Sequence, residues 1–416
     1  MKIVQFTDCY FPTINGVCSS IKSLVSGLAK MDHKLLVIAP LVPTKLSNYP
    51  ADSHLNKENS SQENIKFLYL SSMVMPQLKD NRIGFPWPWK IWSEIKKFSP
   101  DLIHIHTPGT VGLMGLIYAK LFKVPYMFTH HTLFEEYLTY FPFPSSLSKK
   151  LILAWMRLFW NNSFLVVAPS RKVSQRLLEQ GCKAPFKVIP SGLHLDSFRN
   201  GQRDKLQKEL KLSDKPFLYV GRVAYEKSIN FIIEAFSVLN AKLKNEDKLT
   251  EKGAEALPHL VIIGDGPARA DLEKLVDSKD LSLLVHFLGW RKREELKDYY
   301  ASSLAFVFAS ETETQGLVVA EAEAAGLPVI AVKASGVDEA LPQEENLSVD
   351  SGKIDQFAQH MYELWKDRKK AQEMGVVASQ FVEDNFSEKT VLAKYQNIYD
   401  SLSLSEKSRF STENKA

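Results

Sequence analysis

The stretch LAFVFASETETQGLVVAEAEAAGLPVIAV, residues 304–332, contains one complete strand–helix–strand unit. An apolar run at 304–309 leads into a polar loop, then into a segment of helical composition that opens at Gly316, and then into a second apolar run at 328–332. Two strands joined through a helix lie parallel in a sheet. This stretch therefore predicts an α/β fold built on a parallel sheet.

The same alternation runs through the chain in two series. Seven apolar runs precede residue 195, namely 2–6, 34–39, 65–70, 101–106, 125–129, 164–168 and 186–190. Five more follow, namely 217–221, 259–264, 285–289, 304–309 and 328–332. Each is followed by a longer stretch with helical spacing, as in doubly wound sheets. We expect two Rossmann-like domains, 1–195 and 196–386, that face each other across a cleft.

Three further segments complete the predicted organisation. Residues 387–403 begin with a serine cap and have apolar residues at helical spacing, which predicts an amphipathic helix that packs back on the first domain. Residues 404–416 are polar and are expected to fray. Two polar insertions, 50–64 and 241–258, are expected to be surface loops.

Composition indicates an ordinary globular protein. The chain has 416 residues, 45% hydrophobic and 24% charged, which is too long for one compact core. No window approaches about 18 uninterrupted apolar residues, and the N-terminus has no signal-peptide pattern. The three cysteines, Cys9, Cys18 and Cys182, form no CxxC pair, which favours a reducing compartment and argues against structural zinc. We expect a cytoplasmic enzyme.

Charge is distributed unevenly along the chain. Residues 1–195 have 22 Lys and Arg against 11 Asp and Glu, whereas residues 196–416 have 30 against 37. Within 149–187, eight basic residues accompany the single acid Glu179, namely Lys149, Lys150, Arg157, Arg171, Lys172, Arg176, Lys183 and Lys187. An anionic lipid surface or a tRNA would each suit this half, and so would a solvated basic face. We expect an anionic membrane surface and no nucleic acid as partner.

Two cations follow the first strand of the second series. The run at 217–221 ends at Gly221, Arg222 comes next, and Lys227 precedes the next helix. The carboxyl ends of parallel strands are where doubly wound sheets bind ligands. Two cations beside a helix N-terminus can bind a diphosphate and offset the charge that grows on it as a leaving group. A surface pair with Glu226 is the simpler alternative.

Acidic residues flank the start of the helix in 304–332. Glu313 is expected in the loop and Glu321 on the second helical turn, while the free N–H groups of Gly316 and Leu317 would face a phosphate or a sugar hydroxyl. Favourable interaction with the helix dipole would explain Glu313 better than Glu321. Glu321 lies in a helix otherwise rich in Val, Ala and Leu, and acidic side chains are rarely buried in such surroundings without a partner.

These motifs together resemble retaining glycosyltransferase family 4, whose members have the GT-B fold. The resemblance is carried by GRVAYEK (221–227), VIIGDGP (261–267), HFLGW (286–290) and ETQGLVVAEAEAAGLPV (313–329), with the E-x7-E spacing of that family. It implies that Arg222 and Lys227 bind the donor diphosphate, Glu313 the transferred hexose and Glu321 the ribose. Trp290 and Arg291 become candidates for the wall beside the base.

The first half resembles the same family. TDCYFPTINGVCSS (7–20) is similar to its glycine loop after the first strand, which implies that Gly16 lies against the donor phosphate, although a turn glycine would account for the residue equally well. In PYMFTHHTLFEEYLTYFP (125–142), His131 fits the histidine that contacts the sugar, with His130 as an adjacent competitor. For His104 and His106, on the run 101–106, we expect packing roles.

The resemblance also implies a mechanism. Family members with E-x7-E retain the anomeric configuration, and no separate protein nucleophile is evident. We expect the acceptor hydroxyl to attack on the face that the diphosphate leaves, and a leaving-group oxygen to take the proton. The chain has no Asp-x-Asp, and the two cations can do the electrostatic work of Mg²⁺, so we expect neither a metal nor a cofactor beyond the nucleotide-sugar donor.

A resemblance to one subgroup of this family suggests the acceptor. FTHHTLFEEYLTYFP (128–142) and VGRVAYEKSINFII (220–233) are similar to segments of bacterial 1,2-diacylglycerol 3-α-glucosyltransferases, which implies transfer from UDP-glucose to a membrane lipid. Helix 148–161 is apolar nearly all round, which suits either the core or a peripheral membrane face. Segment 84–97 adds Trp87, Trp89 and Trp92 beside three lysines. We therefore expect attachment to the cytoplasmic face of the membrane.

Other functions remain open at the level of sequence. Phosphatidylinositol, a soluble sugar or a glycan would serve as alternative acceptors for the same family. An NAD-dependent dehydrogenase is disfavoured because GDGPAR departs from GxGxxG and the loop after the first strand lacks that motif. A non-catalytic nucleotide-binding or lipid-binding protein would explain the basic half but not the donor residues.

Overall fold

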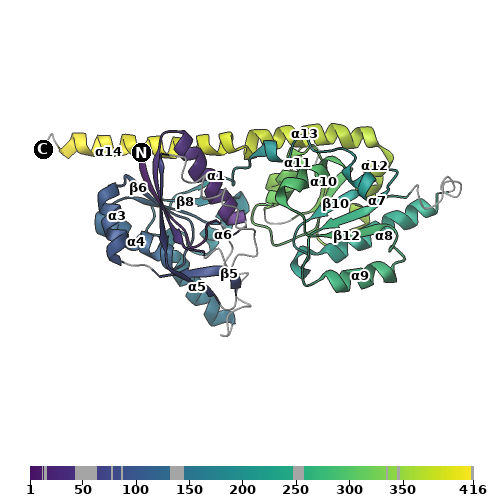
Figure 1. Ribbon diagram of the computed structural model, residues 1–416, viewed down its shortest axis with the longest axis horizontal. Helices are drawn as coiled ribbons and strands as arrows, with labels where there is room; N and C mark the ends of the chain where they lie inside the picture. The colour runs from purple at the N-terminus through teal and green to yellow at the C-terminus, as the bar shows by residue number, and fades with distance from the viewer. Residues whose placement is uncertain are drawn as a thin grey trace. The chain divides into compact units, whose positions relative to one another are not determined.

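The computed structural model describes residues 1–11, 13, 16–42, 63–75, 78–85, 88–131, 145–246, 257–333, 336–343 and 347–413. The chain divides into two compact units, one formed by Met1–Gly192 with Glu388–Ala416 and the other by Leu193–Ser387 (Figure 1). Each unit is built around its own parallel sheet with helices on both faces.

The first unit contains a seven-stranded parallel sheet in the order β3-β2-β1-β6-β7-β8-β9. Its strands are β1 (Lys2–Phe6), β2 (Lys34–Pro40), β3 (Ile65–Leu70), β6 (Leu102–Ile105), β7 (Tyr126–Thr129), β8 (Leu165–Ala168) and β9 (Phe186–Val188). All seven coincide with apolar runs of the first series. The order reverses direction at β1, as it does in doubly wound sheets.

Two helical layers cover this sheet. One comprises α3 (Pro88–Phe98), α4 (Thr110–Phe122), α5 (Ser145–Trp160) and α6 (Arg171–Glu179), and the other comprises α1 (Gly16–Lys30) and α14 (Glu388–Glu413). Side chains along β1 alternate between two apolar cores, with Val4 and Phe6 on the first layer's side and Ile3 on the other. This alternation explains why the strands are apolar on both faces.

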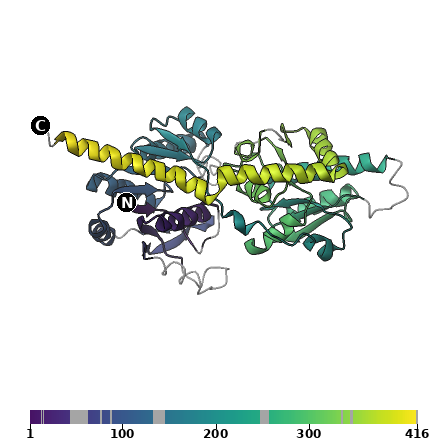
Figure 2. The ribbon, with the colours of Figure 1, turned by 90° about the horizontal axis from the view of Figure 1, so that it is seen from above.

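The C-terminal helix α14 packs on the first unit beside α1, as Figure 2 shows. Val391, Tyr395 and Tyr399 are buried in the core on that side of the sheet. A Cβ on Gly27 of α1 would meet the end of the Leu392 side chain, so the two helices pack closely at this glycine. The helix continues to Glu413, past the end expected at residue 403, and residues 388–413 contain no glycine or proline to stop it.

A two-stranded antiparallel hairpin in the first unit was not predicted. It consists of β4 (Ser72–Met75) and β5 (Leu78–Gly84), which follow directly after β3. The segment LKDNRIG has little strand composition, so its pairing comes from the fold around it. The insertion expected at 50–64 lies outside the described residues apart from Glu63 and Asn64.

The second unit contains a six-stranded parallel sheet in the order β12-β11-β10-β13-β14-β15. Its strands are β10 (Phe217–Val220), β11 (Leu260–Ile263), β12 (Val285–Gly289), β13 (Ala305–Phe308), β14 (Val329–Val332) and β15 (Leu347–Val349). Its α-helices are α7 (Lys205–Leu210), α8 (Ile229–Lys244), α9 (Arg269–Ser278), α10 (Leu296–Ala301), α11 (Leu317–Ala324), α12 (Ile354–Lys366) and α13 (Arg368–Phe386).

Two details of the second unit differ from the sequence prediction. The edge strand β15 was missed because its three residues, LSV, are too few to show a pattern. The loop expected from residue 241 begins later, since α8 continues to Lys244, and residues 247–256 of that insertion lie outside the described residues.

Helix α5 divides its apolar residues between the core and the surface. Met156, Phe159 and Trp160 are buried, whereas the side chains of Leu151 and Trp155 are exposed. The buried face confirms the core role expected for part of this helix, and the exposed apolar residues leave a membrane role as a prediction. None of the helices in the described part of the chain is long and apolar enough to cross a membrane.

Candidate active site

In the second unit, the loop after β10 holds the two predicted cations. Arg222 is two residues beyond β10, and its backbone carbonyl accepts a hydrogen bond from Tyr219 Oη at 3.1 Å. Its guanidinium is exposed and forms an ion pair with Glu226. The surface pair weighed as an alternative is thus present in the structure. Lys227 ends a 3-10 helix at 225–227, just before α8.

Lys227 contacts residues from a distant part of the chain. Its ammonium forms an ion pair with Glu313, and Ser310 Oγ lies 3.5 Å away. Both charged side chains are largely buried, at 19% and 23% exposure. Because β10 and β13 are neighbours in the sheet, the loops that follow them meet at the carboxyl edge. The two motifs predicted to bind the donor therefore form one cluster.

Helix α11 starts beside this cluster. Gly316 precedes it with φ of 62°, a left-handed conformation that favours glycine. The N–H groups of Gly316 and Leu317 come too early for partners within the helix, so they are available to an anionic or hydroxyl ligand. Their binding of a phosphate or a sugar hydroxyl stays a prediction.

Glu321 is held by residues that the sequence analysis did not identify. Its Oε1 accepts a hydrogen bond from Arg293 Nη2 at 2.6 Å, and Tyr300 Oη lies 3.5 Å from Oε2. Burial raises the pKa of the Glu321 carboxyl, while Arg293 and Tyr300 act in the opposite direction. The Arg293 guanidinium also lies over the ring of Phe198, 5.4 Å from its centroid. Glu321 is therefore held by two partners, Arg293 and Tyr300.

Trp290 and Arg291, the two candidates for contact with the nucleotide base, differ in their surroundings. Trp290 is 61% exposed and is available for stacking. Arg291 instead donates to the Leu288 carbonyl and to Tyr299 Oη, the latter at 2.9 Å, and pairs with Glu209 at 3.3 Å. Its guanidinium is thus occupied in linking α7, β12 and α10. Within the run Arg291-Lys292-Arg293, only the folded structure shows which cation reaches Glu321.

The glycines of GDGP bring a third loop to this edge. A Cβ on Gly264 would lie 1.9 Å from the Gly221 carbonyl oxygen, so the two loops approach backbone to backbone. Gly264 N donates to the Gly289 carbonyl at 2.9 Å, and Val223 N to the Asp265 carbonyl at 3.0 Å. The glycine of this motif thus serves loop packing, which agrees with the argument against a dinucleotide fingerprint.

The first unit places Gly16 at the first position of α1, where it is exposed. Close by in sequence, Asp8 follows β1 and was not predicted to matter. Its Oδ2 accepts from Gly109 N at 2.9 Å and from Thr107 Oγ1 at 2.7 Å, and its Oδ1 accepts from Val111 N at 2.7 Å. Asp8 therefore satisfies the free N–H groups at the start of α4, as a capping residue does.

The two adjacent histidines after β7 point to different places. His130 is buried against the aromatic rings of Trp160 and Phe128. His131 reaches His106, with 3.2 Å between His131 Nε2 and His106 Nδ1. His104 and His106, expected to be packed residues, are both buried, and each also makes a side-chain hydrogen bond.

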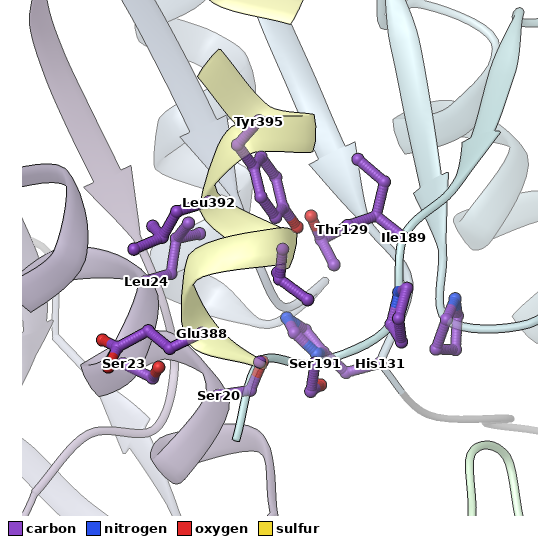
Figure 3. Close-up of a pocket in the computed structure, with 14 residues that line it drawn as sticks. Ser20, Ser23, Leu24, Thr129, His131, Ile189, Ser191, Glu388, Leu392 and Tyr395 are labelled. Carbon is purple, nitrogen blue, oxygen red and sulfur yellow. The ribbon is translucent and has the colours of Figure 1, made fainter. Parts of the chain in front are cut away.

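His131 lines a small pocket within the first unit (Figure 3). The pocket lies between α1, the ends of β7 and β9, and the first turns of α14. Its polar lining includes Ser20, Ser23, Thr129, Ser191 and Tyr395. Hydroxyl groups and an imidazole suit a polyhydroxylated ligand. Among the residues that the structure describes, no three His, Cys, Asp or Glu side chains gather as a metal site.

Comparison with known proteins identifies the family. Residues 14–197 match the description "Glycosyltransferase Family 4" and residues 202–380 match "Glycosyl transferases group 1". The chain belongs to glycosyltransferase family 4. This family 4 glycosyltransferase is 29% identical to the α-monoglucosyldiacylglycerol synthase of Acholeplasma laidlawii, over 88% of each chain. It is 30% identical to the enzyme of the same name from Streptococcus pneumoniae, over 80% of this chain and 71% of that one.

Solved structures agree on the fold of this family 4 glycosyltransferase. Anabaena HepE in complex with UDP matches with a TM-score of 0.71 at 17% identity, over 96% of this chain and 99% of that one. The two Rossmann-like parallel-sheet units are those of the GT-B class. The fold class and the family predicted from the sequence are confirmed.

Proposed function

We propose that the protein transfers glucose from UDP-glucose to the free hydroxyl of 1,2-diacylglycerol, with retention of the anomeric configuration. The observation that supports this most is the cluster of Lys227 and Glu313 beside the start of α11. It brings a cation for the diphosphate and a carboxylate for the hexose to the same edge of one sheet. The lipid acceptor is supported by the names of the two relatives.

Binding of the donor changes the partners inside this cluster. Without ligand, Lys227 and Glu313 neutralise each other. A diphosphate that binds Lys227 takes the place of the carboxylate and leaves Glu313 to accept hydrogen bonds from hexose hydroxyls. Arg222 exchanges Glu226 for a phosphate oxygen in the same way. On the nucleoside side, Glu321 accepts from the ribose hydroxyls and Trp290 stacks on the base.

The chemical step then needs little from the protein beyond charge. The bond from C1 of glucose to the diphosphate oxygen breaks, and a bond from C1 to the acceptor oxygen forms on the same face. The acceptor proton passes to the departing diphosphate, and UDP leaves. Lys227, Arg222 and the N–H groups of Gly316 and Leu317 offset the charge on that leaving group. We expect no essential metal, so excess EDTA leaves the rate unchanged.

The first unit supplies the acceptor side in this proposal. His131 hydrogen-bonds a sugar hydroxyl, and Gly16 at the start of α1 allows a phosphate to approach the backbone. Helix α3 presents the face suited to a membrane, because Ile91 and Ile95 are buried while Trp89 is 83% exposed. The ring of Trp92 packs at a tilt on that of Phe122 of α4, with 4.5 Å between the ring centroids. Trp87 lies outside the described residues.

Lysines surround these aromatic residues. Lys90, Lys96 and Lys97 of α3 are exposed, as are Lys149, Lys150 and Arg157 of α5. Exposed tryptophan beside lysine is the composition of peripheral membrane helices. We therefore propose that the protein attaches to the cytoplasmic face of an anionic membrane through the basic first unit.

A donor-by-acceptor screen tests the proposed reaction. UDP-glucose, UDP-galactose and GDP-mannose are each offered with diacylglycerol, phosphatidylinositol and soluble sugars. We expect turnover with UDP-glucose and diacylglycerol above every other pair. Turnover only with another acceptor would contradict the lipid assignment, and UDP binding without transfer to any acceptor would identify a non-catalytic binding protein.

Co-sedimentation with vesicles tests the membrane part separately. Binding to vesicles that contain phosphatidylglycerol should weaken in high salt and in the double variant Lys149→Glu/Lys150→Glu. Lys30→Glu/Lys34→Glu, which reverses exposed charges elsewhere in the same unit, serves as the matched control. Equal binding to neutral and anionic vesicles would refute the proposed attachment.

A further inference from the structure

A chain of hydrogen-bonded side chains crosses three neighbouring strands in the first unit. Gln5 lies on β1, His106 directly follows β6, and His131 is two residues beyond β7. Gln5 Oε1 is 2.6 Å from His106 Nε2, and His106 Nδ1 is 3.2 Å from His131 Nε2. Since β1, β6 and β7 are adjacent in the sheet, the three side chains form one continuous row.

The row determines where each proton lies. A carboxamide oxygen only accepts hydrogen bonds, so His106 must donate from Nε2. A neutral imidazole has one N–H, which makes His106 Nδ1 an acceptor, and so His131 must donate from Nε2. Burial lowers the pKa of His131 to about 4 and that of His106 well below its usual value, so both rings are neutral near pH 7.

Further contacts keep the His106 ring in place. The ring of His104 packs against it at a tilt, with 3.9 Å between the ring centroids, and His104 Nε2 is 2.7 Å from Thr129 Oγ1. Tyr395 of α14 hydrogen-bonds Thr129 and lies near the His104 ring. Gln5, His104 and His106 are almost completely buried. A ring packed in this way cannot turn to offer its other nitrogen without moving its neighbours.

The remaining nitrogen of His131 is therefore unprotonated. Its Nδ1 makes no hydrogen bond to any residue in the described part of the chain, and His131 lines the pocket shown in Figure 3. We propose that Gln5 and His106 are positioning residues that hold His131 in the Nε2–H form, so that Nδ1 accepts a hydrogen bond from a sugar hydroxyl. The second half of this statement rests on the proposed function.

Imidazole NMR of the ligand-free protein tests the tautomer. Long-range proton–nitrogen correlations of ¹⁵N-histidine protein report which ring nitrogen is protonated, and the His131 signals are assigned by their loss in His131→Gln. We expect His131 in the Nε2–H form. If the Gln5 amide were reversed, its NH2 group would donate to His106, and each proton in the row would move to the other ring nitrogen. His131 would then be in the Nδ1–H form, and finding that form would overturn the proposal.

Variants of His106 test the positioning. His106→Leu removes the acceptor, so His131 should show both tautomers and kcat should fall by about three- to tenfold, as for loss of one hydrogen bond. His106→Asn keeps an acceptor where Nδ1 lies, so the Nε2–H form and most of the rate should return. His33→Leu is the matched control, since His33 is a buried histidine of the same unit that bonds Gln396 instead.

Two results on these variants contradict the proposal. One is an unchanged tautomer and rate in His106→Leu. The other is equal loss in His106→Leu and His106→Asn, which would indicate packing alone. Gln5→Met, which removes the amide at the far end of the row, should reproduce the mixed tautomers and gives a second variant should His106→Leu fold poorly. Failure of the proposed function looks different, because wild type would then show the Nε2–H tautomer yet transfer no sugar.

Discussion

The two units place their candidate residues at the same kind of position but use different chemistry. In both, the residues lie at or near the carboxyl ends of parallel strands. The second unit gathers charges in pairs, Lys227 with Glu313 and Arg293 with Glu321. The first unit gathers neutral imidazoles in a row that ends at His131.

This difference matches the groups that each unit is proposed to bind. A diphosphate is charged, and a site for it needs cations, which pair with carboxylates when no ligand is present. Binding there exchanges one ion pair for another, so it should weaken with salt. Sugar and glycerol hydroxyls are neutral, and neutral donors and acceptors with fixed protons suffice for them. The predictions below test this contrast.

The largest effect is expected for the charged cluster. Lys227→Met should lower the transfer rate by about 100- to 1000-fold, because the leaving diphosphate loses a cation in a largely enclosed site. Lys366→Met, which breaks the ion pair with Glu246 elsewhere in the second unit, is the control and should stay near the wild-type rate. The measurement is the initial rate with UDP-glucose. A Lys227→Met rate within about twofold of wild type would contradict the assignment.

In the first unit, the carboxylate of Asp8 differs from those of Glu313 and Glu321 because helix N–H groups, rather than cations, satisfy it. Asp8→Ala should lower the free energy of unfolding by about 2–3 kcal/mol, since it leaves N–H groups at the start of α4 without an acceptor. Asp8→Asn keeps one acceptor oxygen and should lose less. Urea denaturation measures both, and equal stability of all three proteins would show that the cap is dispensable.

The pair of Arg293 with Glu321 gives a pH-dependent prediction. Burial raises the pKa of Glu321 and Arg293 opposes that rise, so Arg293→Met should leave the carboxyl protonated at higher pH than in wild type. A protonated carboxyl accepts ribose hydroxyls poorly. UDP affinity should therefore fall about tenfold in the variant near neutral pH, and further as the pH is lowered.

Calorimetric titration with UDP over a pH series checks this prediction. Arg199→Met is the control, because Arg199 pairs with Glu383 at 2.6 Å in the same unit. If the UDP affinity of Arg293→Met and that of wild type change in parallel with pH, Arg293 has no role in the donor site. Arg293→Lys should recover part of the affinity.

The smallest effect concerns a carboxyl of the second unit with no cation beside it. Glu323 is fully buried, and neither of its oxygens has a hydrogen-bond partner among the described residues. Burial raises its pKa well above 4.5, so its contribution to stability is present below the unfolded-state pKa and is lost as the pH rises through the folded-state value.

Glu323→Gln removes that titration. It should raise the free energy of unfolding near neutral pH by about 1 kcal/mol and leave it unchanged in acid. Thermal or urea unfolding at both pH values measures the difference. A variant that is less stable than wild type near neutral pH would show that the ionised carboxylate is stabilised in the fold.

The sequence was enough to predict most of the strands and the charged motifs. Twelve strands of the two sheets coincide with apolar runs, and most of them are buried on both faces, which makes a strand apolar throughout. The hairpin β4-β5 and the edge strand β15 were missed because their composition does not distinguish them from loops. Motif spacing also placed Lys227 and Glu313, whose side chains meet in the structure.

Partners that depend on distances across the fold could not be read from the sequence. Nothing in the run Arg291-Lys292-Arg293 shows that Arg293 reaches Glu321 while Arg291 is bound to Tyr299 and Glu209. The row from Gln5 to His131 joins residues more than 100 positions apart, and only the strand order brings them together.

The central claim is that the cluster of Lys227 and Glu313 in the second unit serves α-glucosyl transfer to a lipid. The most direct test measures transfer of labelled glucose from UDP-glucose to diacylglycerol in anionic vesicles, by wild type and by Glu313→Gln, with NMR of the product's anomeric proton. We expect an α-linked monoglucosyl lipid from wild type and at least about 100-fold less from the variant. A β-linked product, or equal transfer by the two proteins, would contradict the account.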